Sequence, residues 1–326
     1  MSQDTTLKGV LIAFVCFVAY AISDASVKLI DGRVPPLEAA FFGSCFGLLA
    51  VPFLLKRGDR LSDLVRTTNR PLWLLRFVCS AIGTVGSIIA FTELSMAEAF
   101  SLIFLLPSFA TILSVIFLKE KVGPRRWSAV VIGFVGVLIV LRPGFRELSF
   151  GHLTALVSGF TGAVSIVIYR AVGPAEKSVS LYGAGFLGSL LISGALMAPG
   201  FVWPTVHDFS LLASFGILAT VGNVLLMVAS FYASAAVVGP IQYSQMIWAV
   251  LFGYVLFGDR LDTPMFAGIV LIVGSGLLTV IRERTRGVPL PPSLAAAPQA
   301  ALPAEPEASA YAEAIRVDAP VPRTES

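Results

Sequence analysis

Two amides and an indole recur every three residues within an apolar stretch, residues 240–248. They are Gln242, Gln245 and Trp248. In a helix this spacing places the three side chains along one face. Amides without hydrogen-bond partners are costly in lipid, so we expect this face to point into a helix bundle. There it would bind an amphipathic organic solute and not a bare ion; the alternative is that both amides bond neighbouring helices.

Other polar and aromatic side chains in apolar stretches are candidates for contact with the same solute. Two of them are Tyr243 beside the amides and Phe104 on an apolar face opposite them. Asn223, Tyr20, Tyr169 and Tyr232 are weaker candidates of the same type. Together they predict a site that combines hydrogen-bonding groups with aromatic rings.

Charged side chains also stand within apolar stretches. A charge at the bilayer centre costs roughly 2.5–3.5 kcal/mol on insertion scales, so each requires a partner or a water-filled cavity. Asp24 either binds a proton or cation, or pairs with Lys28 one helical turn away. Arg76 either binds a carboxylate or phosphate of the solute, or extends back to the headgroups. Glu93 and Glu98 flank a short turn and are interpreted as turn and cap residues in preference to a proton relay.

The composition of the chain places these residues in a membrane. Of 326 residues, 56% are hydrophobic and 13% are charged, about half the ~25% charged fraction of a soluble domain. The mean hydropathy is +0.86. This composition, with a net charge of only +3, excludes general disorder, a disulfide scaffold and nucleic-acid binding. The three cysteines are interpreted as small core residues, and a polytopic membrane protein is predicted.

Ten apolar runs of about 18 to 24 residues have the length needed to cross the hydrocarbon core. They must be helices, because backbone amides in lipid are satisfied only within their own segment. The predicted spans are residues 7–28, 36–55, 71–93, 97–118, 125–142, 151–170, 179–198, 209–231, 235–257 and 263–281. The predicted fold class is therefore an all-α integral membrane protein.

Lysine and arginine concentrate in the loops on the same side of the membrane as the N-terminus. By the positive-inside rule, both termini are expected in the cytoplasm and the protein in the inner membrane. The predicted division is a short cytoplasmic N-terminus (1–6), a first five-helix unit (7–142), a second unit (151–281) and a tail (282–326). The tail is rich in proline and alanine, which predicts a disordered, solubilising segment.

The two five-helix units match each other in sequence. A shift of 142 residues sets Lys28 on Arg170, and a shift of 139 sets Glu120 on Asp259. Five is an odd number, so the second unit enters the membrane upside down relative to the first. Inverted repeats support two conformations that expose a central site alternately to each side, which predicts alternating access.

A proline interrupts the fourth predicted span. Pro107 removes a backbone hydrogen bond in mid-helix and frees a carbonyl group, which predicts a hinge. Its counterpart in the second unit is Met246, so the kink is expected in one unit only. Small-residue motifs such as Gly43-x-x-x-Gly47 and Ala184-x-x-x-Gly188 predict close helix contacts, within one chain or between two, so the protein is a monomer or a homodimer.

The two-unit pattern and several motifs resemble the drug/metabolite transporter (DMT) superfamily, EamA type. The motifs are residues 91–97, which close the third span, and residues 117–122, followed by Trp127 and Gly136. The resemblance covers residues 8–282 and implies a secondary active transporter of a small organic metabolite: an amino acid, nucleoside, vitamin, S-adenosylmethionine or drug. It also implies, together with the polar faces, a midplane cavity lined by helices 1, 3, 4, 6, 8 and 9.

The opening helices are similar to a bacterial branch of this superfamily labelled metabolite or S-adenosylmethionine transporters. The similarity rests on Phe17, Asp24 and Lys28, followed by Glu38 and Phe41. That branch often has arginine where Gly43 stands here.

The rival classes are a membrane-embedded enzyme and a channel or scaffold protein. The sequence has no Gly-rich phosphate loop for ATP-driven transport. His152 and His207 are far apart, and no His, Cys and carboxylate set has the spacing of metal ligands. We therefore expect neither catalysis nor a cofactor or metal, and a small-molecule substrate in contact with a protein embedded in the bilayer.

Overall fold

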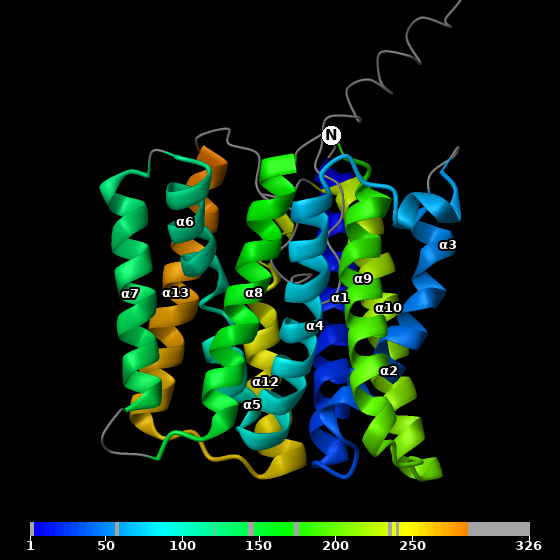
Figure 1. Ribbon diagram of the computed structural model, residues 1–326. Coiled ribbons are helices and arrows are strands. Elements are labelled where there is room, and N and C mark those ends of the chain that lie inside the picture. The colour runs from blue at the N-terminus through cyan, green and yellow to red at the C-terminus, as the bar shows by residue number, and fades with distance from the viewer. Residues whose placement is uncertain are drawn as a thin grey trace, which may run out of the picture.

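The computed structural model describes residues 3–55, 59–120, 122–142, 147–172, 176–233, 237–238 and 241–285, and within these ranges it contains helices and no strands (Figure 1). The helices of the first unit are α1 (Gln3–Ile30), α2 (Pro36–Gly47), α3 (Val51–Leu54), α4 (Arg70–Glu93), α5 (Met96–Ile103), α6 (Leu106–Phe117) and α7 (Pro124–Leu141). Those of the second are α8 (Phe150–Val172), α9 (Ser178–Met197), α10 (Val206–Tyr232), α12 (Ser244–Phe257) and α13 (Thr263–Thr285). Short 3₁₀ turns η1 (Leu48–Ala50), η2 (Leu61–Leu64) and η4 (Ala198–Gly200) join them.

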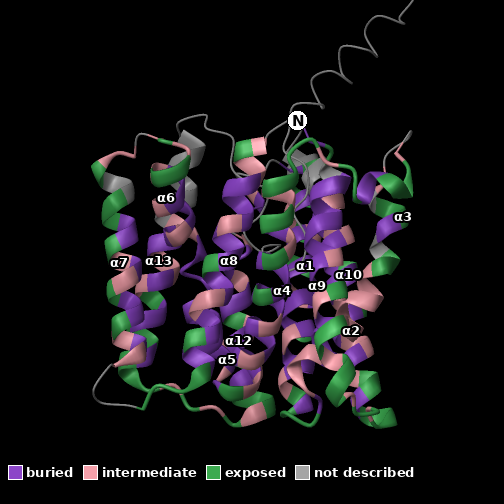
Figure 2. Ribbon diagram, in the orientation of Figure 1, coloured by how far each residue is buried: buried purple, intermediate pink, exposed green. Residues whose placement is uncertain are grey.

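Six helical stretches of the described chain are long and apolar enough to cross a membrane. They are Leu7–Ile30, Arg70–Glu93, Met96–Phe117, Phe150–Val172, Val179–Gly200 and Val206–Ala229, with shorter apolar helices at Trp127–Leu141, Ser244–Phe257 and Thr263–Leu277. Figure 2 shows buried and exposed residues on different faces of the same helices. Large apolar side chains, among them Ile82, Val131 and Phe266, are exposed. The protein is a multi-pass, all-helical membrane protein, as predicted.

The helices run alternately up and down in Figure 1. Helices α1, α4 and α7 descend, whereas α8, α10 and α13 ascend. The lower face therefore holds the connections α1–α2, α4–α5, α7–α8, α9–α10 and α12–α13. The upper face holds the N-terminal end of α1, the C-terminal end of α13 and the remaining connections.

Local side-chain chemistry explains where several helices begin. Asn69, Ser95 and Thr205 each accept a hydrogen bond from a backbone N–H in the following turn, as N-cap residues do. Proline stands in the first turn of α2, α4, α6 and α7, where its missing N–H has no helical partner to lose.

Two predicted spans are interrupted by a turn in the structure, and the second predicted span (36–55) is divided into α2 and α3 by the 3₁₀ segment η1. The fourth, predicted over 97–118, consists of α5 and α6 with a turn at Phe104 and Leu105. The ninth, predicted over 235–257, has a turn at residues 242–243 before α12 begins. In both turns an N–H bonds the carbonyl three residues back instead of four: Leu105 bonds Leu102, and Met246 bonds Tyr243.

The expectation of a kink in one unit only is therefore wrong. Pro107 lies in the first turn of α6, so it follows the break in the first unit. The second unit breaks at the corresponding place, although Met246 stands there. The carbonyl of Ile103, four residues before the proline, faces Gly159, where an added Cβ would lie 2.9 Å from it.

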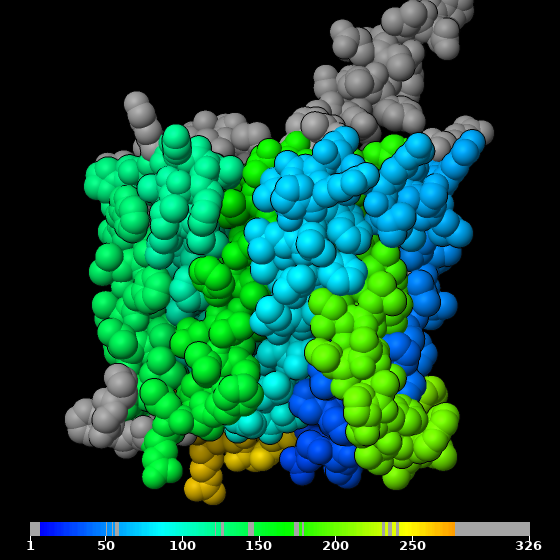
Figure 3. All heavy atoms as spheres, viewed as in Figure 1, coloured from blue at the N-terminus to red at the C-terminus, as the bar shows by residue number. Residues whose placement is uncertain are grey.

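The small-residue motifs make their close contacts within this chain. Gly188 on α9 lies so near the backbone carbonyl of Phe77 on α4 that a Cβ there would clash with it. The most extensive helix pairings are α1 with α10, α4 with α8 and α9, α7 with α13, and α2 with α9 and α10. On the face shown in Figure 3, atoms of α4, α8 and α9 form a continuous wall.

The helices at both ends of the chain extend into the predicted N-terminal segment (1–6) and the predicted tail (282–326). Residues 3–6 of the predicted N-terminal segment are already part of α1. Of the predicted tail, residues 282–285 continue α13, and residues 286–326 lie outside the described residues.

Candidate functional site

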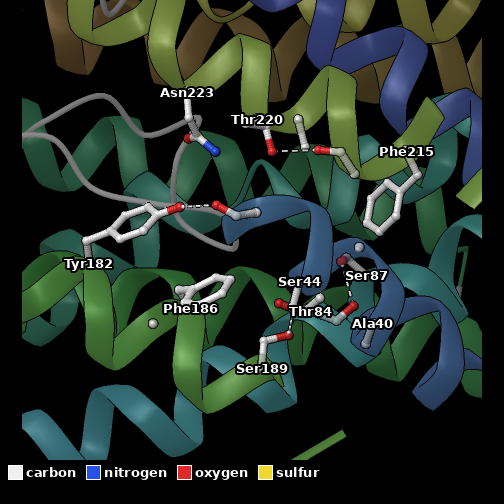
Figure 4. A pocket seen from close by; sticks show the side chains of 15 residues that line it. Ala40, Ser44, Thr84, Ser87, Tyr182, Phe186, Ser189, Phe215, Thr220 and Asn223 are labelled. Carbon is white, nitrogen blue, oxygen red and sulfur yellow. Dashed lines mark hydrogen bonds between the residues drawn. The ribbon is translucent and has the colours of Figure 1, made fainter. Parts of the chain in front are cut away.

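A cavity of about 60 Å³ lies between α2 and α4 of the first unit and α9 and α10 of the second (Figure 4). Its polar lining consists of Ser44, Thr84, Ser87, Ser189, Thr220 and Asn223, and its aromatic lining of Tyr182, Phe186 and Phe215. The remaining lining residues are glycine or alanine. Small residues leave the space, and hydroxyl and amide groups surround it.

Hydrogen bonds across this cavity join the two units. Ser44 Oγ and Ser189 Oγ lie 3.0 Å apart and connect α2 with α9 (Figure 4). The Tyr182 hydroxyl donates to the carbonyl of Gly47 over 3.2 Å. The Thr220 hydroxyl lies 3.1 Å from the carbonyl of Phe46 and so links α10 with α2. Each contact is between neutral groups, which a solute carrying similar groups can replace.

An aromatic ring occupies the space next to Gly43. A Cβ added at this glycine would lie 2.3 Å from the Phe215 ring on α10. The ring therefore fills the position that a side chain on residue 43 would take. The absence of a side chain at Gly43 is what permits α2 and α10 to pack at this distance.

Two of the predicted residues, Tyr20 and Asn223, meet at the edge of the cavity. The Tyr20 hydroxyl on α1 donates to Asn223 Oδ1 on α10 over 2.7 Å. Both side chains are buried, and Asn223 also lines the cavity. The contact joins α1 to the polar lining and leaves the asparagine carbonyl satisfied.

The Arg76 side chain on α4 is buried and contacts α8 and α9. The residue is 3% exposed, and its Nε donates to the carbonyl of Leu181 over 2.7 Å. Its guanidinium carbon stands 4.4 Å from the centroid of the Tyr169 ring. Its Nη2 lies next to Gly185, a cavity residue, where an added Cβ would be 3.0 Å away. Among the described residues no carboxylate pairs with it.

Asp24 and Lys28 do not form the ion pair that their spacing permits. Lys28 Nζ donates to the carbonyl of Leu94, at the α4–α5 turn, and stands 5.1 Å over the Phe257 ring. Asp24 lies one helical turn from Tyr20 on α1, and it makes no hydrogen bond or ion pair within the described part of the chain.

The predicted polar face of the ninth span begins in the turn before α12. Gln242 lies in that turn, and Gln245 and Trp248 lie on the helix; both amide side chains are buried. In the described residues, Gln242 Oε1, Ser244 Oγ and Trp248 Nε1 are buried without a hydrogen-bond partner. The Trp248 ring packs between Phe14 and Phe252. None of these α12 residues lines the cavity described above.

Phe104 and Tyr243, the other predicted aromatic residues, contact each other. Their ring centroids are 5.7 Å apart in an edge-to-face arrangement, and each ring belongs to one of the two helix breaks. The structure thus places the predicted contact residues in four groups: Tyr20 with Asn223, Phe104 with Tyr243, Gln242 with the α12 residues Gln245 and Trp248, and Arg76 against α9.

The helices that line the cavity differ from those that were predicted to line it, which are helices 1, 3, 4, 6, 8 and 9. The third and eighth predicted helices, α4 and α10, do line it, but the second and seventh, α2 and α9, supply the remainder. Ser44, Tyr182 and Ser189 were therefore missed. The neighbouring glycines Gly43 and Gly185 are the sequence feature that could have pointed to these residues, because small residues on two facing helices leave space between the helices.

Comparison with known proteins adds independent observations. The model of the EamA-like transporter family matches residues 7–142 and 149–281. The pseudopaline exporter CntI of Pseudomonas aeruginosa is 26% identical over 276 residues, which is 84% of this chain and 96% of that protein. A riboflavin transporter of Rhizobium johnstonii is 28% identical over 256 residues (77% and 83%). An S-adenosylmethionine uptake transporter of Rickettsia bellii is 23% identical over 268 residues (82% and 91%).

One protein of known crystal structure has the same fold. It aligns with a TM-score of 0.58 at 18% sequence identity and covers 86% of this chain and 98% of its own. At this identity the likeness concerns the fold alone.

Proposed function

The chain belongs to the EamA-like transporter family, and we propose that it is a secondary active transporter that moves a small organic metabolite by alternating access. The similar proteins are named as transporters of pseudopaline, riboflavin and S-adenosylmethionine, and not as enzymes. The proposal carries over to this chain the class of cargo, a small organic molecule with polar groups. It assigns no cofactor and no nucleic-acid partner.

One pair of matching hydrogen bonds carries the proposal that the two units are inverted repeats. The Cys16 thiol on α1 donates to the carbonyl of Gly222 on α10 over 3.1 Å. The Ser158 hydroxyl on α8 donates to the carbonyl of Gly83 on α4 over 3.0 Å. The sequence shifts of 142 and 139 residues set Cys16 on Ser158 and Gly83 on Gly222. The same contact is therefore made twice with the units exchanged.

The helix pairings support the same interpretation. If α1, α2 and α4 correspond to α8, α9 and α10, then the α1–α10 contact corresponds to α8–α4, and α2–α10 to α9–α4. Exchanging the two units turns the pair α2–α9 into the same pair, and it does the same for α7–α13. Corresponding helices such as α1 and α8 run in opposite directions (Figure 1). This pattern is that of a pseudo-two-fold axis in the membrane plane.

The size of the cavity indicates which movement transport requires. About 60 Å³ accommodates water molecules, whereas pockets for small organic ligands measure about 300–1,000 Å³. We propose that α2 and α4 move away from α9 and α10, first at one face and then at the other. The cavity lies where the two units meet, so this movement would enlarge it. The Ser44–Ser189 contact would then be exchanged for contacts with the substrate.

Three groups of residues are proposed to contact the substrate as it passes. Asn223 and Tyr20 would bind it from the cavity edge, and Arg76 would attract an anionic group. The unpartnered polar atoms of Gln242 and Trp248, with Gln245 and Tyr243 beside them and Phe104 opposite, would bind it at the helix breaks. Discontinuous helices in corresponding positions of two repeats are where transporter sites form.

Coupling and movement are assigned to two further residues. Asp24, a carboxylate without a described partner one turn from Tyr20, is proposed to bind the coupling proton or cation. Pro107, in the first turn of α6, is proposed to keep the adjacent break open as a hinge. We further propose that the upper face is cytoplasmic and that the membrane is the inner membrane, because lysine and arginine concentrate in the upper connections. Monomer and homodimer remain the two alternatives for the assembly.

The proposed function is tested by transport in proteoliposomes that contain the purified full chain. Thermal-shift screening against metabolites, with riboflavin and S-adenosylmethionine included, selects the labelled solute. A secondary transporter gives saturable uptake that is accelerated by unlabelled solute on the opposite side. Uptake that does not saturate and shows no such acceleration would indicate a channel, and a chemically altered solute would indicate an enzyme.

A further inference from the structure

The aromatic rings that line the cavity all belong to the second unit. Tyr182 and Phe186 lie on α9, and Phe215 lies on α10. The sequence shifts of 142 and 139 residues, which relate the two units, set these rings on side chains of the first unit that are not aromatic: Ala40, Ser44 and Arg76. The two sides of the cavity therefore differ in chemistry, although the helices that form them correspond.

Matching contacts between α2 and α9 support this correspondence. Ser44 on α2 lies against Ser189 on α9, with their hydroxyl oxygens 3.0 Å apart. Phe186 on α9 lies against Gly47 on α2, where an added Cβ would be 3.1 Å from the ring. The shift of 142 residues sets Ser44 on Phe186 and Gly47 on Ser189, so it turns the first contact into the second.

A guanidinium group and a phenyl ring occupy equivalent places in the two units. A Cβ added at Gly43 would lie 2.3 Å from the Phe215 ring, and a Cβ added at Gly185 would lie 3.0 Å from Arg76 Nη2. The shift of 142 residues sets one glycine on the other, and both glycines line the cavity. The cavity is therefore bordered by a ring beside one glycine and by a positive charge beside the other.

The positive charge of Arg76 lacks a counterion within the described part of the chain. The residue is buried, and its Nε donates to a neutral group, the carbonyl of Leu181. No carboxylate of the described residues pairs with it, and the residues that line the cavity in that part of the chain carry no charge. A buried charge without an opposite charge is costly. An anionic group that arrived beside Gly185 would supply the missing charge.

The aromatic side of the cavity offers flat surfaces. The Tyr182 and Phe186 rings are parallel to within 3°, with centroids 5.9 Å apart (Figure 4). The residues that the first unit contributes to the lining are glycine, alanine, serine and threonine. Such small residues leave space across from the rings, and aromatic rings pack favourably against other planar groups.

We propose that the cavity takes a planar organic carboxylate, whose ring lies against the aromatic residues of α9 and α10 and whose carboxylate binds Arg76. This inference rests on the proposed function, because the cavity must enlarge before such a solute fits. The rings belong to one unit and the guanidinium to the other. The solute is therefore held in one orientation, although the two units correspond.

The number of charges selects a carboxylate over a phosphate ester. A phosphate monoester carries about −1.5 to −2 charges at neutral pH. Arg76 supplies a single positive charge, and the described lining supplies no other. One carboxylate is neutralised by this guanidinium, whereas a phosphate would keep an excess of negative charge in a buried place. An ammonium group in the same position would be repelled.

Four small probes test the proposal without the natural solute. Binding to the purified full chain in lipid nanodiscs is measured by calorimetry, with titrations into empty nanodiscs subtracted. The probes are phenylpropionate, phenylpropanol, phenylpropylammonium and cyclohexylpropionate. The first three share a ring and differ in charge. Phenylpropionate and cyclohexylpropionate share a carboxylate, but the cyclohexyl ring is not planar.

Phenylpropionate should bind most tightly of the four. Its Kd should be at least about tenfold lower than that of phenylpropanol, because the alcohol lacks the charged hydrogen bond. It should also bind more tightly than cyclohexylpropionate, by the factor of about two to ten expected for one aromatic contact. Equal or tighter binding of any other probe, or no binding of phenylpropionate, would overturn the proposal.

Two variants should remove the two preferences separately. Arg76→Gln should abolish the preference for the carboxylate over the alcohol and retain the preference for the phenyl ring. Phe186→Leu should lower the preference for the phenyl ring and retain the preference for the carboxylate. Each preference is a ratio of two Kd values in the same variant, so a fraction of misfolded protein does not affect it. An unchanged preference in either variant would overturn the proposal.

Three further variants serve as controls. Arg76→Lys keeps the positive charge and should keep the preference for the carboxylate, also if Arg76→Gln fails to fold. Arg70→Gln at the exposed start of α4 and Phe209→Leu at a 45% exposed position of α10 should keep both preferences.

Failure of this proposal is distinguishable from failure of the proposed function. A protein that carries out saturable transport of a neutral or cationic solute would be a transporter without this specificity. The predicted preferences in a protein that shows no transport of any bound carboxylate would support the binding site and contradict the transport.

Discussion

Phe104 and Tyr243 stand 139 positions apart in the sequence, and their rings meet edge to face with centroids 5.7 Å apart. This separation is the shift that relates the two units, so a residue and its own counterpart are in contact. Each ring also sits in the turn that breaks its helix. The two breaks therefore face each other across the boundary between the units. A movement of one unit relative to the other would change the contact between the two rings.

Gly43→Ala should overpack the contact between α2 and α10. The added Cβ would lie 2.3 Å from the Phe215 ring, so the ring must move. Overpacking of this kind costs about 1–3 kcal/mol of stability, and we expect a lower unfolding temperature and a lower maximal transport rate. Phe215→Leu should restore part of both in the double variant. The matched control is Gly274→Ala on α13, where no atom lies within 4 Å of an added Cβ.

Gln242→Met and Trp248→Phe separate a substrate-binding role from a structural one. Because Gln242 Oε1 and Trp248 Nε1 have no partner in the described structure, apolar replacements of similar shape should leave the unfolding temperature unchanged or raise it. If these atoms bind substrate, transport should nevertheless fall at least about tenfold, for a lost hydrogen bond worth about 1.4 kcal/mol. Full transport would remove Gln242 and Trp248 from the site.

Arg76→Gln should weaken binding of an anionic substrate. The guanidinium is buried at the cavity edge without a described carboxylate partner, and a charged hydrogen bond contributes about 1.5–3 kcal/mol. We expect the Kd of the transported solute, measured by calorimetry, to rise at least tenfold. Arg70→Gln, at the exposed start of α4, is the control. An unchanged Kd in Arg76→Gln would show that the positive charge serves only the contact between α4 and α9.

Lys177→Met should alter the acid stability of the upper face. Lys177 Nζ lies 2.7 Å from Asp63 and 3.0 Å from Asp59, and its hydrogen bond holds the pKa of Asp63 below the usual range. A lowered carboxyl pKa contributes stability above about pH 4 that is lost as the pH falls through the lowered pKa. The unmodified protein should therefore unfold at a higher temperature than the variant near neutral pH. The difference should vanish in acid, and a difference independent of pH would refute this account.

Hydropathy predicted the positions of the helices well because a membrane span needs a long apolar run. It could not predict the breaks, since Phe104 and Leu105 are ordinary helix residues and the turn arises from the contacts around them. Pro107 signalled that the fourth span was irregular, but the same irregularity in the second unit occurs where Met246 stands.

The candidate site was predicted in part, and the misses have physical causes. The Tyr20–Asn223 and Phe104–Tyr243 contacts join residues selected because polar and aromatic groups are conspicuous in apolar helices. Ser44 and Ser189 were missed because small hydroxyl residues are as common in helix contacts as in cavities. The sequence spacing also suggested an ion pair between Lys28 and Asp24. In the folded chain Lys28 instead donates a hydrogen bond to the carbonyl of Leu94 at the α4–α5 turn.

The central claim, that two inverted units open the two faces in turn, is tested most directly by spin-label distances across each face. In a background without Cys16, Cys45 and Cys79, one protein carries labels at Ser62 and Tyr232 on the upper face. A second carries them at Thr92 and Trp203 on the lower face. We predict two states, between which solute or a change in pH shifts the protein. In one state the upper-face distance is long and the lower-face distance is short, and in the other state the lower-face distance is long and the upper-face distance is short. Both distances lengthening together, or neither changing in a protein that transports, would contradict the account.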